Sequence, residues 1–228
     1  MDKEKPKLIL SLIFPTCLIV AIWIVKIIET SFGYNLYYLG IKPLEFNGLL
    51  GIVTSPFIHA DYSHLIANTL PLFLLCWGLF YFYRKISFQV FFLIYFITGI
   101  WVWTFARDAY HIGASGIVYA LASFLFFSGL FRRDMKLAAV SMLIIFLYGG
   151  MIWGILPLKE RVSWESHLMG LLSGLLISYF YRKDGPQRKK YEWELEEEDD
   201  EEDTGHHNQE DDREIQIKYI YKNGNIRD

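Results

Sequence analysis

Cysteine is scarce in this sequence, with two residues in a chain of 228. Cys17 and Cys76 both lie inside apolar runs and lack the spacing of metal ligands, so we interpret them as small buried hydrophobic residues. This excludes a scaffold held together by disulfide bonds. We expect neither a metal ion nor a cofactor.

The sequence also lacks the concentrated basic face that a nucleic-acid-binding protein needs. Residues 184–228 hold 16 acidic and 7 basic residues, a net charge of −9, whereas the remainder of the chain carries +6. The basic residues of that remainder stand at the ends of apolar runs, which is where a membrane protein places them. We therefore expect no nucleic-acid partner, and the pattern indicates contact with a lipid bilayer.

Long apolar runs dominate the first part of the chain, which raises the hydrophobic content to 53% and the aromatic content to 18%. A helix that crosses the bilayer core needs about 20 apolar residues, and six stretches reach or approach that length. The fourth and sixth contain Gly and Ser, which suits helices packed among other helices. The sequence predicts an all-α membrane protein with six transmembrane helices, at about 8–28, 64–83, 86–106, 115–131, 136–156 and 165–181.

Basic residues mark one side of the predicted bundle. They precede the first run and follow the second, fourth and sixth, notably at Lys7, Arg84-Lys85, Arg132-Arg133 and Arg182-Lys183. The positive-inside rule then places both termini in the cytoplasm, and we expect a bacterial inner membrane. A cleaved signal peptide is the alternative for the first run, but that run is long and no small-x-small cleavage site follows it.

Two segments differ from the apolar runs. The loop of about residues 30–63 is rich in Gly, Pro and aromatic residues, which predicts a compact loop lying partly in the outer leaflet. Residues 184–228 follow the predicted six-helix domain of residues 1–183 and include an unbroken acidic run, Glu196–Asp203. This composition predicts a disordered cytoplasmic tail. A strand that docks on a partner is the alternative, because residues 215–219 alternate in polarity.

Polar residues are costly within a membrane and are candidates for function. The first group is His59, His64 and Asn68, of which the last two are four residues apart and share one helix face. Both can donate hydrogen bonds. The alternative is a polar pair that holds helices together.

The second group surrounds Ser115 at the beginning of an apolar run. A serine at this position is commonly a helix cap. However, Gly113 and Gly116 flank it, and glycine allows another backbone to come close, while free N–H groups at a helix start can hold an oxyanion. Tyr119 follows four residues later, so its ring lies over the same face as Ser115.

The third group lies in the sixth run. His167 precedes Gly170 by three residues and so lies on nearly the same face as the pair Gly170 and Gly174. Two glycines four residues apart form a groove for close packing of a neighbouring helix. This arrangement presents His167 to whichever helix fills the groove.

Together the three groups supply the parts that a serine nucleophile needs. Ser115 offers the nucleophile, His167 the base, and the pair His64/Asn68 an oxyanion site. Asp108 lies in a loop before the helix, so we expect a Ser–His dyad rather than a triad, with Tyr119 positioning the imidazole.

The order and spacing of these motifs resemble those of the rhomboid intramembrane serine proteases. The resemblance covers residues 8–182 and rests on His-xxx-Asn, Gly-x-Ser-Gly and His-xx-Gly-xxx-Gly in successive runs. It implies that Ser115 is the nucleophile, that His167 is the general base, and that Asn68, His64 and the Ser115 N–H form the oxyanion hole. His59 matches a further family histidine, and Tyr119 matches the aromatic residue that stacks on the catalytic histidine.

The resemblance also implies the substrate: single-span transmembrane proteins, cut near their outer end. The Trp-Arg pair of many family members is absent from the first loop.

Ser115 begins a run of about 25 Å that ends at Arg132-Arg133, so we expect it below the outer surface, in a polar cavity covered by residues 154–163. The alternatives are a catalytically silent rhomboid-like protein that binds membrane clients, and a transporter, for which inverted repeats are missing.

Overall fold

The computed structural model describes residues 4–132, 139, 142, 154–156 and 163–184. Within these ranges the regular elements are helical, and an isolated antiparallel bridge joins Ile41 to His111. The acidic tail, with its predicted disorder and the strand-like residues 215–219, lies outside the described residues. Most of the fifth predicted span, 136–156, also lies outside them, so the count of six spans stays a prediction.

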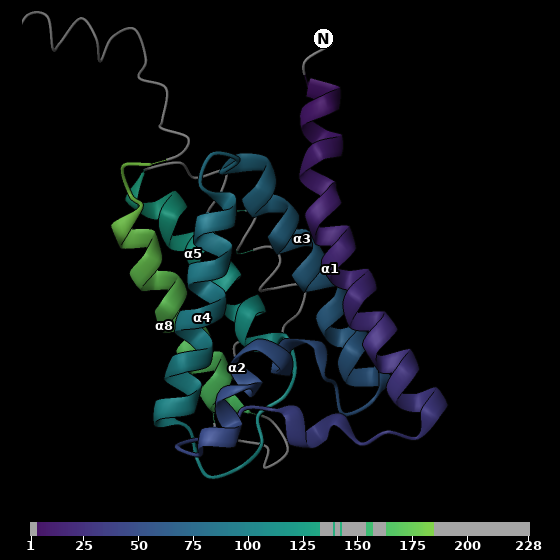
Figure 1. Ribbon diagram of the computed structural model, residues 1–228. Coiled ribbons are helices and arrows are strands. Elements are labelled where there is room, and N and C mark those ends of the chain that lie inside the picture. Colours follow the sequence, from purple (N-terminus) through teal and green to yellow (C-terminus); the bar gives the residue numbers. More distant parts are fainter. Residues whose placement is uncertain (1–3, 133–138, 140–141, 143–153, 157–162, 185–228) are drawn as a thin grey trace, which may run out of the picture. The chain divides into compact units, whose positions relative to one another are not determined.

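Three helices are long and apolar enough to cross a membrane: α1 (Glu4–Phe32), α3 (Tyr62–Phe82) and α4 (Ser87–Phe105). Two shorter apolar helices, α5 (Ser115–Phe131) and α8 (Trp164–Phe180), pack against each other and beside α4 (Figure 1). These five helices occupy the first four and the sixth of the predicted spans. The coarse prediction of a helical, membrane-spanning bundle is thereby confirmed.

The ends of the helices follow from local chemistry. Gly33, at φ 66°, takes the left-handed conformation that ends α1, which glycine adopts without a steric cost. The Asp61 carboxylate caps α3 by accepting the His64 N–H at 2.7 Å. Ser163 caps α8 in the same way by accepting the Ser166 N–H.

The loop between α1 and α3 is compact. It contains the short turns η1 (Leu36–Leu39), η2 (Phe46–Leu49), α2 (Gly51–Thr54) and η3 (Ser55–Phe57). Ile41 exchanges two backbone hydrogen bonds with His111, at 2.9 and 2.8 Å, so the loop is fixed to the segment that precedes Ser115. Its position in the outer leaflet stays a prediction.

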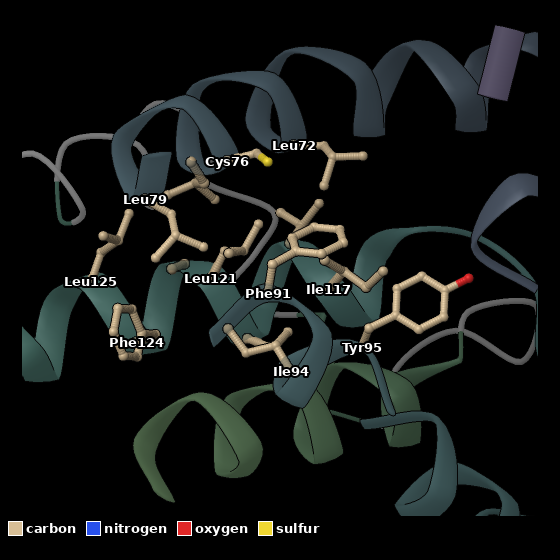
Figure 2. Packing of buried hydrophobic residues seen from close by; sticks show 14 of the residues in the cluster. Leu72, Cys76, Leu79, Phe91, Ile94, Tyr95, Ile117, Leu121, Phe124 and Leu125 are labelled. Atoms are coloured by element: carbon tan, nitrogen blue, oxygen red, sulfur yellow. The ribbon is translucent and has the colours of Figure 1, made fainter. Parts of the chain in front are cut away.

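The hydrophobic core lies where α3, α4 and α5 meet. Figure 2 shows Leu72, Cys76 and Leu79 of α3 facing Phe91 and Ile94 of α4 and four apolar side chains of α5, namely Ile117, Leu121, Phe124 and Leu125. Helix α1 joins this core from the side through Phe14 and Ile22, and Phe14 stacks on Phe80 with ring centroids 4.7 Å apart.

The prediction that both cysteines are buried was wrong for one of them. Cys76 is buried in the core, but Cys17 is exposed on α1. The reason is that α1 presents much of its apolar surface outward, with Ile9 62% exposed. An apolar side chain on that surface of a membrane protein faces lipid rather than the protein core.

Two glycines bring α8 onto α5. A methyl group built on Gly170 would lie 2.1 Å from the Gly116 carbonyl oxygen, and one on Gly174 would lie 2.1 Å from the Ala120 carbonyl oxygen. Only hydrogen at these positions permits the observed approach of the two backbones. This close packing carries the first turn of α8 to the first turn of α5.

Candidate active site

Ser115 and His167 meet where α5 and α8 begin. Ser115 is the first residue of α5, and its Oγ lies 2.8 Å from Nε2 of His167 in the first turn of α8. The other ring nitrogen, Nδ1, lies 2.7 Å from the Gly154 carbonyl oxygen, which can only accept. Nδ1 therefore carries the hydrogen, and Nε2 is left to accept the Ser115 hydroxyl proton. This is the tautomer that a general base requires.

The imidazole of His167 is held on its face as well as at its edge. The Tyr119 ring stacks on it with centroids 4.2 Å apart and planes 9° from parallel. Gly154 lies so close that a methyl group there would come within 2.9 Å of His167 Nδ1 and would collide with the Tyr119 hydroxyl. Contacts with the Gly154 carbonyl group, the stacked Tyr119 ring and the Ser115 hydroxyl thus fix the orientation of the His167 imidazole.

His64 and Asn68 both lie on α3, and His64 is close to the segment that precedes Ser115. The His64 ring packs directly on Gly113, where a methyl group would meet its Cε1 at 2.7 Å. Gly113 also has φ 104°, a conformation that other residues rarely adopt, and its N–H donates to the Ser55 carbonyl at 2.9 Å. The Asn68 amide nitrogen donates to the His64 carbonyl at 2.9 Å and keeps a second hydrogen for another acceptor.

His59 is buried behind His64. It is 1% exposed, and the two histidine rings meet edge to face at 5.0 Å. Neither ring nitrogen of His59 makes a hydrogen bond of standard geometry with the described residues. Burial, followed by repulsion from His64, lowers the pKa of His59 to about 3, so the ring is neutral at pH 7.

A small cavity of about 30 Å³ lies between the α1–α3 loop, α4 and the beginning of α5. The glycines on both sides of Ser115 line it, and Ser55, Thr98 and Ser166 contribute polar side chains. A cavity of this size has room for water, which needs about 10–15 Å³ measured in this way. The cavity therefore has space for water beside Gly116, the residue that follows Ser115.

Sequence reasoning missed a buried lysine in the first span. Lys26 donates hydrogen bonds to the Glu29 carboxylate at 2.8 Å and to the carbonyl oxygens of His59 and Ala60 at 2.9 and 3.1 Å. It thereby fixes the turn that leads into α3. The available signal was its charge within an apolar run, which is costly unless the group is paired.

Four further polar residues near the dyad were also overlooked. Glu165 is 4% exposed and forms an ion pair with Arg107, while His111 and Ser163 are joined by a hydrogen bond. Glu165 is the first residue of the sixth predicted span. A carboxylate within a predicted span could have identified it as a candidate for function. Among the described residues, no cluster of three or more His, Cys, Asp or Glu side chains could hold a metal ion.

Comparison with known proteins identifies the family. The rhomboid domain family matches residues 47–184, which is more than half of the chain. Uncharacterized proteins of Mycobacterium tuberculosis (strain H37Rv) and Mycobacterium leprae (strain TN) are 31% and 30% identical over 182 and 178 residues. These alignments cover 74% of this chain in both cases, and 73% and 69% of the relatives.

A Bacillus subtilis (strain 168) protein named "Putative rhomboid protease YdcA" is 30% identical over 158 residues, which is 66% of this chain and 73% of that protein. The domain match includes all of the site residues described above except Lys26 and Glu29. The chain is an integral membrane protein that belongs to the rhomboid family.

Proposed function

We propose that this protein is an intramembrane serine endopeptidase in which Ser115 is the nucleophile and His167 the general base. The observation that carries the proposal is the 2.8 Å hydrogen bond from Ser115 Oγ to His167 Nε2, with the opposite nitrogen held by the Gly154 carbonyl. A serine hydroxyl is a weak nucleophile unless a correctly oriented base accepts its proton. Membership of the rhomboid family supports the same reaction.

The reaction would proceed in two halves. Ser115 Oγ attacks the scissile carbonyl carbon while His167 Nε2 takes the hydroxyl proton, and the imidazolium then gives this proton to the leaving amine. Water next attacks the acyl-enzyme with the same histidine as base, which releases the new carboxyl group and restores the serine. The stacked Tyr119 ring and the Gly154 carbonyl keep the imidazole in place through both halves.

Charge develops on the carbonyl oxygen during each attack. Donors for it would come from the Ser115 N–H, the second amide hydrogen of Asn68, and His64. The packing of His64 on Gly113, two residues before Ser115, supports this role. We expect the water of the second half to come from the cavity that Gly113 and Gly116 line.

The substrates would be single-span membrane proteins, cut near their outer end, and the enzyme would lie in the bacterial inner membrane with both termini in the cytoplasm. Basic residues after the second and fourth apolar runs support this topology. A site that opens outward also fits the polar donors of α3, which would be unfavourable against lipid.

The primary test is to compare wild type with Ser115→Ala and His167→Ala in detergent. Two readouts are needed: cleavage of a reporter transmembrane substrate, and labelling by a fluorophosphonate, which reacts only with an activated serine. Both variants should lose both activities while keeping the wild-type melting temperature. The double variant should lose little more than either single one, because members of a catalytic unit are not additive.

Wild-type protein that neither cleaves nor is labelled would favour the silent rhomboid-like alternative. Cleavage that survives Ser115→Ala would refute the proposed nucleophile. The topology is tested separately with Ser115→Cys in a background that lacks Cys17 and Cys76. A membrane-impermeant thiol reagent should modify this cysteine from outside, and modification from the cytoplasmic side alone would overturn the proposed orientation.

A further inference from the structure

A chain of hydrogen bonds outside the proposed dyad joins the α4–α5 loop to the first turn of α8. His111 in the loop has its Nδ1 2.6 Å from Oγ of Ser163, the residue that caps α8. Ser163 Oγ lies 2.6 Å from Ser166 Oγ and accepts the Ser166 N–H at 3.3 Å. The reaction proposed above gives these three side chains no role.

The positions of the protons in this series of hydrogen bonds follow from one fixed acceptor. His111 Nε2 lies 3.0 Å from the Arg107 carbonyl oxygen, which can only accept, so Nε2 carries a hydrogen. Burial lowers the pKa of His111, against the opposing effects of the Arg107 hydrogen bond and the Glu165 carboxylate, and the ring is neutral near pH 7. Nδ1 must then accept, and the Ser163 hydroxyl must donate to it.

The first and last residues of this hydrogen-bond series belong to the segments that carry Ser115 and His167. His111 stands four residues before Ser115, and its backbone is paired in both directions with Ile41. Ser166 directly precedes His167. The hydrogen-bond series therefore connects the segment that carries Ser115 with the segment that carries His167. It does so without using the Ser115–His167 hydrogen bond.

An ion pair runs between the same two segments. The Arg107 Nε lies 3.4 Å from a carboxylate oxygen of Glu165, and the Glu165 side chain is 5% exposed. Removing one partner of a pair in which a charge is buried leaves that charge uncompensated, which is strongly unfavourable. The loop and the helix end are thus joined twice, by a neutral chain and by a charged pair.

We infer that His111 and Ser163 are positioning residues, which fix the first turn of α8 against the segment that carries Ser115. The inference rests on the proposed function. The first turn of a helix is where backbone N–H groups lack intrahelical partners and where the helix opens most easily. Ser163 supplies both the cap of that turn and its connection to His111. A displacement of about 1 Å at a catalytic group can cost about 10²-fold in rate.

The test distinguishes the effect of the His111–Ser163 hydrogen bond from the effect of the Ser163 cap on α8. His111→Leu removes the connection and leaves the Ser163 cap, whereas His111→Gln retains one acceptor and one donor for Ser163 and the Arg107 carbonyl. We expect the Leu variant to lose about 10- to 100-fold in kcat and in fluorophosphonate labelling rate, with KM within about twofold of wild type. The Gln variant should recover most of both.

Ser173→Ala is the matched control. Ser173 Oγ is also buried on α8 and also joins it to a neighbouring helix, through Thr98 at 2.7 Å, but it lies six residues beyond His167. Its labelling rate should stay near wild type. Melting temperatures of all variants show whether a loss in rate simply follows a loss in stability.

Wild-type labelling by His111→Leu would overturn the inference, as would equal losses in the Leu and Gln variants that track their melting temperatures. The result for Ser115→Ala in the same series keeps the two proposals apart. If that variant is not labelled while His111→Leu behaves as wild type, the positioning role alone fails. If Ser115→Ala is labelled as wild type is, the proposed function fails.

Discussion

Replacing Gly170 by Ala should separate the proposed base from the nucleophile. The added methyl carbon would stand 2.1 Å from the Gly116 carbonyl oxygen, whereas ordinary van der Waals contact begins at 3.4 Å. The obstructing atom belongs to a helix backbone and cannot move out of the way as a side chain would. The helices α5 and α8 must therefore move apart by about 1.3 Å to relieve the clash.

The consequence for catalysis follows from where this glycine lies. Gly170 is one turn after His167, so a displacement of α8 lengthens the 2.8 Å bond to Ser115. Misplacement of about 1 Å can reduce the rate by about 10²-fold, and we expect a loss of that order in kcat/KM. Overpacking costs about 1–3 kcal/mol, and the better helix propensity of Ala offsets about 1 kcal/mol of it. A net destabilisation of at most about 2 kcal/mol should remain.

Gly78→Ala is the control for the substitution itself. Among the described residues, a methyl group at Gly78 meets only the flexible end of Leu125, at 3.3 Å, so this variant should be active and as stable as wild type or slightly more so. The assays are cleavage of a reporter transmembrane substrate, fluorophosphonate labelling and thermal unfolding in detergent. Activity of Gly170→Ala within about threefold of wild type would refute the argument that backbone contact sets the dyad distance.

Three other predictions concern the oxyanion site, the buried histidine and the tail. Asn68→Ala should lower turnover by about 10²–10³-fold without abolishing it, and unchanged turnover and labelling would make Asn68 merely structural. Because burial lowers the pKa of His59 from 6.5 to about 3, its contribution to stability is complete above pH 6.5 and is lost as the pH falls toward 3. Thermal unfolding should reveal a loss of about 2 kcal/mol between pH 7 and pH 5, and an equal pH dependence in His59→Gln would contradict this origin. A chain that ends at Lys190 should retain cleavage of the reporter substrate, and loss of activity with folding intact would show that the tail controls the enzyme.

The helices could be predicted because a long apolar run has few alternatives to a membrane-spanning helix. The predicted span 115–131 coincides with α5, since Gly113 and Ser115 mark its beginning and Arg132 its end. The first span was predicted too short. The helix continues past residue 28 to Phe32, and the carboxylate of Glu29 is paired with Lys26 inside it.

The contacts that surround the dyad could not be predicted in the same way. His111 and Ser163 are 52 residues apart, and Lys26 and His59 are 33 apart. Each stands singly in a loop or near a helix end, where no periodicity indicates a partner. The exposure of Cys17 illustrates the same limit, because an apolar run does not reveal which of its sides faces lipid and which faces protein.

The buried ammonium of Lys26 bears on where the folding unit begins. Its three hydrogens are matched by three oxygens, two of which are main-chain carbonyls of His59 and Ala60. The rhomboid-domain match starts at residue 47, so the cation and Glu29 lie outside the matched region, while the two carbonyl acceptors lie inside it. A polypeptide that began at residue 47 would lack this cation and would also expose the core surface that Ile22 covers. The region that the family model matches is therefore smaller than the region that these contacts hold together, which includes the N-terminal helix.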